Sequence, residues 1–301
     1  METRMMADVR STRQLRADGM DARALRRAVG EGSVKRVRRG AYRPAGEIGL
    51  RDEHRRLVEA TIGELQPGTV VSHASAAVLH GLVVRQGALQ RVHLTRHGRG
   101  RRNQTVHVHP APLLDQECTS VRGIPVTTIA RTLADLGRTE ELRWAVAGLD
   151  DALRRNLTGP SDLAVAVERA RGLPGIHGLR AAIPLADARC ESVGESLCRV
   201  AFHQWGLPAP VLQHEVNDSR GLVGRVDMAW PEHKVLVEFD GKVKYSSLVR
   251  PGETPSEVVW REKRREDRLR ALGWQVIRVT WDEIFSAPEA VCRQVAAALW
   301  R

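Results

Sequence analysis

Residues 225–240, RVDMAWPEHKVLVEFD, constrain the fold more than any other stretch of the chain. Two apolar runs flank a polar bend at Pro231–His233, which predicts two antiparallel strands. In that pairing Asp227 falls opposite Glu238, close enough for side chains on a shared face to converge. Strand alternation places Val235, Val237 and Phe239 on one face and Leu236, Glu238 and Asp240 on the other. Acids in apolar strands are costly to bury alone, so a metal ion, a basic partner or water must accompany them.

The flanking sequence predicts an α/β domain over residues 189–301. A helix (ESLCRVAFHQWG) precedes three strands, and a long helix, a further strand and a last helix follow. The long helix has a capping box, with Thr254 as N-cap, Pro255 as first helical residue and Glu257 facing the cap, and Gly273 ends it. We therefore expect a mixed sheet flanked by helices.

The paired carboxylates favour a divalent cation. Like charges at that spacing repel unless a cation lies between them. Mg²⁺ prefers carboxylate oxygens together with water and phosphate oxygens, and it can ionise a water that attacks a phosphodiester. A nearby lysine can neutralise charge that develops on the phosphate. Mg²⁺, or Mn²⁺ in its place, is thus the expected cofactor.

The same residues resemble the PD-(D/E)XK nuclease superfamily, and most closely its Vsr-like endonuclease domains. The resemblance spans roughly residues 190–285 and implies a restriction-endonuclease-like fold with Asp227, Glu238 and Asp240 at the metal. Glu195, on the preceding helix, would be an auxiliary carboxylate. The superfamily has a lysine two residues after the glutamate, where this chain has Asp240. Residues that could replace the lysine are Lys242, Lys244 and Lys263.

Residues 1–50 predict a winged helix-turn-helix. Ser11 and Asp21 can cap two short helices, and SVKRVRRGAYRP follows as a basic hairpin. In such a module the second helix enters the DNA major groove and the wing tracks phosphates. The expected DNA-binding residues are Arg13, Arg23, Arg26, Arg27, Lys35, Arg36, Arg38 and Arg39. A solvated basic face on a protein–protein module remains the alternative.

A second resemblance covers roughly residues 7–140. The winged helix followed by SHASAAVLHGL and GIPVTTIARTLADL is similar to AbiEi-type antitoxins of type IV toxin–antitoxin systems. It implies DNA binding without catalysis. Residues 51–188 would then be an AbiEi-like α/β and helical middle region. The whole chain is expected to be an α+β or α/β multidomain protein.

Within the middle region, residues 91–96 and 105–111 alternate like the strands of a β-hairpin. Their glycine-rich connector, HGRGRRN, suits either a DNA-backbone contact or a solvated loop. His107 and His109 share one strand face, as metal ligands would. No third ligand stands at a usual spacing, so we expect them to be ordinary core or exposed histidines.

Net charge and composition limit the classes of binding partner and the compartment that we expect. The 301-residue chain has a formal net charge of +11 and a sequence pI of about 10.4, which favours nucleic acid. No apolar run or leader-like N-terminus indicates a membrane or an export route, so the cytoplasm is expected. The four cysteines form no CxxC pair, which argues against a disulfide framework or structural zinc. A homodimer is compatible with the sequence.

The sequence leaves two functional hypotheses. The leading one is a DNA-binding protein whose C-terminal domain is a metal-dependent DNA endonuclease. The alternative is an antitoxin-like DNA-binding transcriptional regulator with a catalytically inactive nuclease fold.

Overall fold

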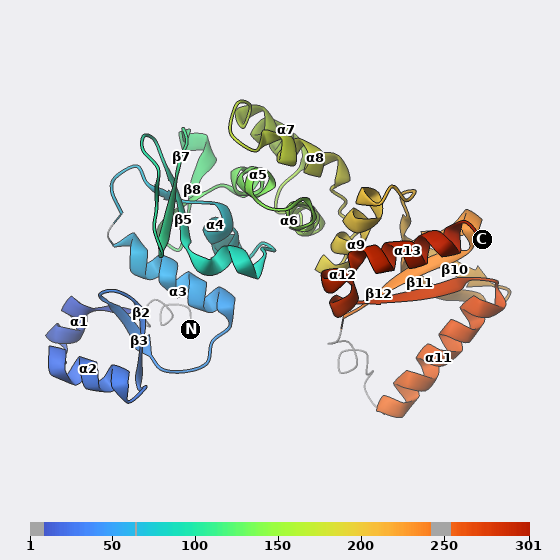
Figure 1. The fold of residues 1–301 in the computed structure, drawn as a ribbon, viewed down its shortest axis with the longest axis horizontal. Coiled ribbons are helices and arrows are strands. Elements are labelled where there is room, and N and C mark those ends of the chain that lie inside the picture. The colour runs from blue at the N-terminus through green and yellow to red at the C-terminus, as the bar shows by residue number, and fades with distance from the viewer. Residues whose placement is uncertain (1–8, 64, 242–253) are drawn as a thin grey trace. The chain divides into compact units, whose positions relative to one another are not determined.

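The computed structural model describes residues 9–63, 65–241 and 254–301, and within them all side chains except those at 255, 258 and 259. The chain divides into two compact units (Figure 1). Unit 1 comprises residues 1–140 and 158–179, and unit 2 comprises residues 141–157 and 180–301. The predicted three-part division into 1–50, 51–188 and 189–301 stays a prediction.

Unit 1 begins with the expected winged helix-turn-helix module. Its order is β1 (Arg10–Ser11), α1 (Thr12–Ala17), α2 (Ala22–Gly30), β2 (Val34–Arg38) and β3 (Ala41–Pro44), and the sheet order is β1-β3-β2. The Ser11 side chain accepts from the Gln14 N–H in a full capping box, and the Asp21 side chain caps α2. Leu15 and Leu25 are buried beneath the two helices.

The rest of unit 1 is a six-stranded sheet with helices packed on it. The sheet order is β6-β7-β5-β4-β9-β8. Val58, Ala76, Val92 and Val126 belong to one buried cluster that joins helices to strands. The bounds are α3 (Leu50–Ile62), β4 (Val70–Val71), α4 (His73–His80), η2 (Gln86–Gln90), β5 (Val92–Arg96), β6 (Arg101–Arg102), β7 (Val106–Pro110), η3 (Asp115–Glu117), β8 (Cys118–Val121), β9 (Ile124–Thr127), α5 (Ile129–Thr139) and α7 (Pro160–Arg169).

The predicted hairpin of residues 91–96 and 105–111 is wrong. β5 and β7 are neighbours but run parallel, with Val92 beside Val106 and His93 beside His107. After β5 the chain crosses to the sheet edge, forms the two-residue β6, and returns as β7 between β6 and β5. The side chain of Asn103 makes the return turn by accepting the N–H groups of Thr105 and Val106.

Unit 2 contains the mixed sheet flanked by helices that the sequence predicts. Its strands are β10 (Val211–Asp218), β11 (Gly221–Trp230), β12 (Val235–Asp240) and β13 (Gln275–Thr280), in the order β10-β11-β12-β13. The first three are antiparallel and β13 runs parallel to β12. The bend between β11 and β12 is the short helix η5 (Pro231–His233).

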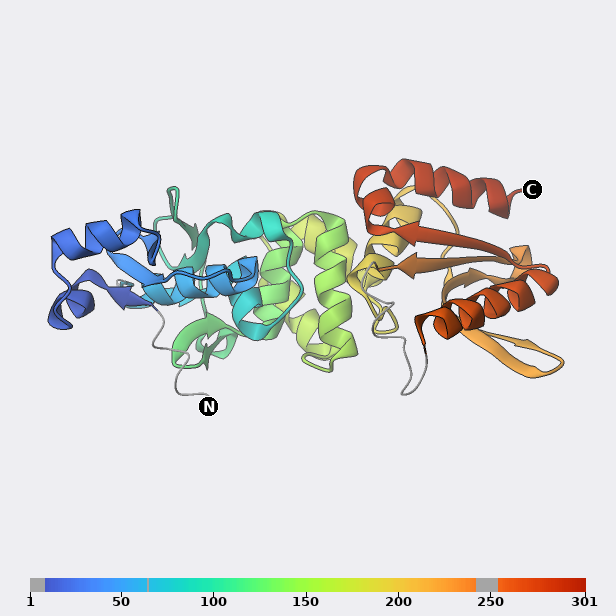
Figure 2. The ribbon, with the colours of Figure 1, turned by 90° about the horizontal axis from the view of Figure 1, so that it is seen from below.

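Helices cover both faces of this sheet, as Figures 1 and 2 show for α13 and α11. Val235, Val237 and Phe239 face a core shared with α9 and α13, whereas Leu236 packs in a separate cluster with Leu269 of α11. The alternation predicted for β12 is therefore confirmed. The helices are α6 (Leu142–Arg154), α9 (Val193–Gln204), α11 (Pro255–Ala271), α12 (Trp281–Ser286) and α13 (Pro288–Leu299), while α8 (Ile176–Ala182) and η4 (Ile183–Leu185) lie where unit 1 gives way to unit 2.

In the parts of the chain that the structure describes, no helix has the length and apolar character that a membrane crossing needs.

Candidate nucleic-acid interface and carboxylate site

The second helix of the winged helix-turn-helix presents arginines to solvent. Arg23, Arg26 and Arg27 are all exposed on α2. The carboxylate of Asp21 accepts the N–H groups of Arg23 and Ala24, which fixes the start of this helix. The exposed guanidinium groups have the fork geometry that suits phosphate oxygens and guanine edges.

A groove of about 300 Å³ lies beside these arginines. Arg16 from α1, Arg26 from α2 and Arg36 from β2 all line it, together with apolar side chains such as Leu25. The sequence did not single out Arg16. Arg16 lies in the last turn of α1, just before the chain bends toward α2, and this position could have indicated its role.

Some wing residues are exposed to solvent, and others contact α3. Arg36 and Arg39 are exposed, as is Arg13 at the start of α1. Lys35 forms an ion pair with Glu53 of α3 at 2.7 Å. Arg38 instead turns to α3, where its Nε donates to the Ala60 carbonyl oxygen at 2.9 Å. Lys35 and Arg38 thus attach the wing to α3.

The two central acids of unit 2 lie on neighbouring strands, as the register requires. Met228 pairs with Val237, so Asp227 is the next position along β11 and Glu238 the next along β12. The last backbone pair between β11 and β12 is Met228 with Val237. The Asp227 carboxylate accepts the N–H of Phe239 at 2.8 Å. This partner of Asp227 is therefore a backbone donor, which is none of the three partners expected from the sequence.

Glu238 has a basic partner that the sequence did not identify. Nη2 of Arg265, on α11, donates to both Glu238 oxygens at 2.7 and 2.8 Å. Burial raises the pKa of Glu238, and the Arg265 charge opposes that shift. The pKa of Arg265 is in turn raised by its hydrogen bonds and charge interactions with Glu262 and Glu238, which outweigh its desolvation. The dense charge run REKRRED hid this residue among many equivalent candidates.

Glu195 is buried at the start of α9, as its proposed auxiliary role requires. Its Oε2 accepts from Gln213 Nε2 and from the Glu191 N–H, both at 2.9 Å. Gln213 has a φ of +52°, uncommon for a residue inside a strand. It lies between the pairs Leu212–Met228 and His214–Val226, so it stands across from Asp227. Backbone strain of this kind often accompanies a functional position.

The other residues predicted for the metal site are Asp240 and three lysines. Asp240 ends β12 beside Thr280 of β13, and Lys263 is exposed on α11. Lys242 and Lys244 lie outside the described residues. Across the described ranges, Glu195, Asp227, Glu238 and Asp240 supply no set of three whose ligand atoms all lie within 4.8 Å of one another.

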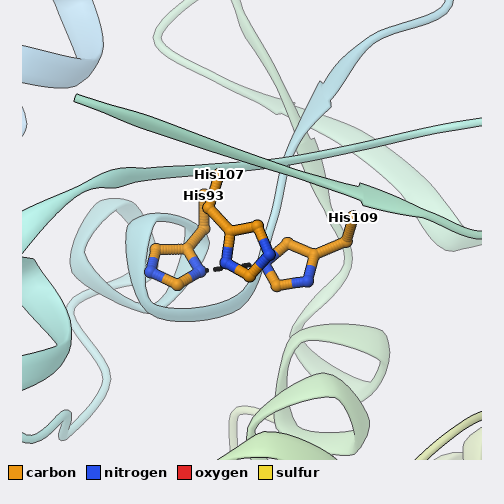
Figure 3. A group of neighbouring side chains, drawn as sticks. All are labelled: His93, His107 and His109. Carbon is orange, nitrogen blue, oxygen red and sulfur yellow. Dashed lines mark hydrogen bonds between the residues drawn. The ribbon is translucent and has the colours of Figure 1, made fainter. Parts of the chain in front are cut away.

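Three histidines of unit 1 do meet that criterion within the described part of the chain: His93, His107 and His109. Figure 3 shows their rings side by side. Nδ1 of His93 is 3.0 Å from Nε2 of His109, and the ring centroids of His107 and His109 are 3.8 Å apart. The expectation that His107 and His109 lack a third partner is therefore wrong, because parallel pairing brings His93 beside His107.

Comparison with known proteins supports the reading of the N-terminus. The family model described as "Transcriptional regulator, AbiEi antitoxin" matches residues 11–45. These are the residues of the winged helix-turn-helix from the α1 N-cap to just beyond β3. The match coincides with the structural module and indicates a DNA-binding regulator domain.

Two curated relatives extend the similarity beyond that module. They are Uncharacterized protein MT2308 from Mycobacterium tuberculosis (strain CDC 1551 / Oshkosh) and Uncharacterized protein Rv2248 from Mycobacterium tuberculosis (strain ATCC 25618 / H37Rv). Each is 32% identical over 181 residues, which is 60% of this chain. The match spans 64% of each relative, just under two thirds of its length.

Proposed function

We propose that the protein is a DNA-binding transcriptional regulator of the AbiEi antitoxin kind. The observation that carries the proposal is the coincidence of the regulator match at residues 11–45 with a winged helix whose second helix exposes Arg23, Arg26 and Arg27. In this reading α2 enters the major groove, and Arg36 and Arg39 hold phosphates on the wing. Unit 2 then has a role without bond cleavage.

The test is salt-dependent binding of labelled duplex DNA, measured by fluorescence anisotropy. Each lost phosphate contact should reduce the slope of log Kd against log salt by about 1. We expect that reduction for Arg36→Ala. The control is Arg293→Ala, which removes the same charge from an exposed position on α13. Equal slopes for the two variants, or binding insensitive to salt in the wild type, would refute the proposal.

A second candidate function is metal-dependent DNA cleavage by unit 2. The adjacent positions of Asp227 and Glu238 on β11 and β12 favour it, with Glu195 buried nearby on α9. Two carboxylates from neighbouring strands fit the oxygen preference of Mg²⁺. For Glu238 to bind a cation, Arg265 would have to give up its two contacts with that carboxylate.

Incubation of supercoiled plasmid with Mg²⁺ or Mn²⁺ separates the two functions. The nuclease hypothesis requires nicked or linear product that disappears in Asp227→Asn, and the regulator hypothesis requires no cleavage at any metal concentration. Glu238→Gln is informative in both cases. It should abolish cleavage under the nuclease hypothesis and leave DNA affinity unchanged under the regulator hypothesis.

A further inference from the structure

The histidine cluster is built by the parallel pairing of β5 and β7. His93 lies directly beside His107, and His109 lies two residues further along β7. Residues in register on parallel strands, and residues two apart on one strand, point to the same face. All three imidazoles consequently project from one face of the sheet, from rigid strand positions.

We propose that His93, His107 and His109 bind one divalent transition-metal ion of the Zn²⁺ class. Three neutral imidazoles with no carboxylate or thiolate suit zinc and its neighbours, and not Mg²⁺ or Ca²⁺. Nitrogen ligands at about 2.0–2.1 Å from a tetrahedral zinc lie about 3.3 Å from one another. The His93 and His109 nitrogens are already 3.0 Å apart. Three protein ligands leave the fourth position to water or a small anion.

The three rings share a partly desolvated environment. Burial, with help from neighbouring imidazoles, lowers the pKa of His93 to about 4 and that of His109 to about 2. The pKa of His107 is also lowered, by burial and then by the charges of Arg102 and Arg91. Burial thus disfavours the protonated form of each ring, while the proposal itself rests on the position of the three ring nitrogens.

Surrounding groups hold the ligand rings in place. The ring of His73, at the start of α4, stacks on His109 with centroids 3.7 Å apart. Nδ1 of His73 lies 2.9 Å from Ser72 Oγ, which also accepts the hydroxyl of Thr95. The His93 N–H donates to Ser75 Oγ. The stacked ring of His73 restrains the ring of His109, and the contact with Ser75 holds the backbone of His93.

Two further observations bear on the electrostatics. Nε2 of His73 is buried and has no hydrogen-bond partner in the described structure, which marks this pocket as an unusual polar environment. Asp135 acts on His109 with a charge that favours a cation. The positive charges of Arg91 and Arg102 oppose it near His107. Asp135 is itself paired with Arg131 and Arg138, so the nitrogen donor set and its geometry carry the proposal.

The experiment is Zn²⁺ titration of the full-length protein after chelator treatment, followed by calorimetry. We expect one equivalent to bind. Co²⁺ should bind at the same site and produce visible absorption, and excess Mg²⁺ should displace neither ion. His107→Asn should raise the Kd for Zn²⁺ roughly tenfold or more.

The matched control is His97→Ala, which removes an exposed histidine just beyond the end of β5. It should leave the Kd unchanged. A wild type that binds no Zn²⁺, or equal affinities for His107→Asn and His97→Ala, would overturn the proposal. X-ray absorption at the zinc edge on the wild type does not depend on variants. A first shell lacking three imidazole nitrogens would overturn it as well.

Discussion

Asp135 of α5 is a buried carboxylate with several charged neighbours. Its side chain is fully buried, and its Oδ1 accepts from Arg138 at 2.7 Å and from Arg131 at 3.1 Å. Arg131 also pairs with buried Glu117 at 2.9 Å. His73 Nδ1 lies 3.8 Å from the other Asp135 oxygen. Asp135 and Glu117 thus balance the two buried guanidinium groups, and Asp135 contacts both of them.

Removing this carboxylate should be costly. Asp135→Ala leaves Arg131 and Arg138 with less compensation in a dry interior, and breaking a buried pair costs about 3–5 kcal/mol. Chemical denaturation of the variant should show a loss of that size. The control, Asp52→Ala, removes an exposed partner of Arg55, where about 0–1 kcal/mol is typical. Similar losses in both variants would contradict the assigned role of Asp135.

His54 of α3 gives a prediction for pH. Burial lowers its pKa, with a smaller contribution from Arg51, while its hydrogen bond to the Leu89 carbonyl opposes the shift. With Nδ1 donating to Leu89, Nε2 accepts the Ser75 hydroxyl at 2.8 Å, and a second ring proton would require that hydroxyl to turn away. The nearby imidazole of His93 on β5 is itself neutral at pH 7.

At pH values between the lowered pKa of folded His54 and about 6.5, His54 is protonated in the unfolded chain and neutral in the folded protein. The free energy of unfolding should therefore fall as pH drops below about 6.5, by up to about 1.4 kcal/mol per pH unit from this group. His54→Asn keeps the donor to Leu89 and removes the titration. Denaturant titrations should show a shallower acid decline for the variant. An unchanged slope would show that His54 titrates normally.

At the scale of elements, helix α9 packs directly onto strand β12. A methyl group added at Gly194 would overlap the ring of Phe239, whereas one added at Gly241 would meet that ring at an ordinary 4.0 Å. Phe239 belongs to the main core of unit 2 and meets Trp281 edge to face. The missing side chain at Gly194 sets how closely helix and strand approach.

Gly194→Ala should consequently destabilise unit 2 by about 1–3 kcal/mol, the usual cost of overpacking a core. Gly241→Ala should change stability little. Thermal melting of both variants, monitored by tryptophan fluorescence, tests the difference. If the two melt together, the helix and strand have room that the geometry does not show.

Local signals were enough to predict the element boundaries that depend on neighbours in sequence. The helix caps at Ser11 and Asp21 and the capping box of Thr254 with Glu257 are confirmed, and so is the bend at Pro231–His233. The direction of β7 was not predictable in this way. Two alternating runs with a short connector resemble a hairpin, and a two-residue strand such as β6 has too little periodicity to reveal the crossover.

The candidate sites show the same dependence on long-range geometry. Asp227 and Glu238 could be placed together because one bend determines their register. The pairing of Glu238 with Arg265 depends on how α11 packs on the sheet, which local sequence does not specify. The histidine cluster was not predicted because His93 meets His107 and His109 only through the pairing of β5 with β7, which local spacing does not reveal.

At the scale of the whole molecule, the charge is unevenly distributed along the sequence. Residues 1–100 contain nineteen Lys and Arg but ten Asp and Glu, so they hold nine of the eleven net positive charges. The remainder of the chain is close to neutral. An excess of this kind in the part that carries the winged helix suits attraction to DNA.

The crossover between β5 and β7 has a mechanical consequence. An ion held by His93 and His107 would clamp the two ends of the segment that carries Arg99, Arg101 and Arg102. Trypsin cleaves after arginine in chains that open locally, and a clamp makes such opening rarer. Addition of Zn²⁺ should slow tryptic nicking within residues 97–105 in the wild type and leave it unchanged in His107→Asn. The stability of residues 97–105 toward local opening would then depend on the concentration of metal.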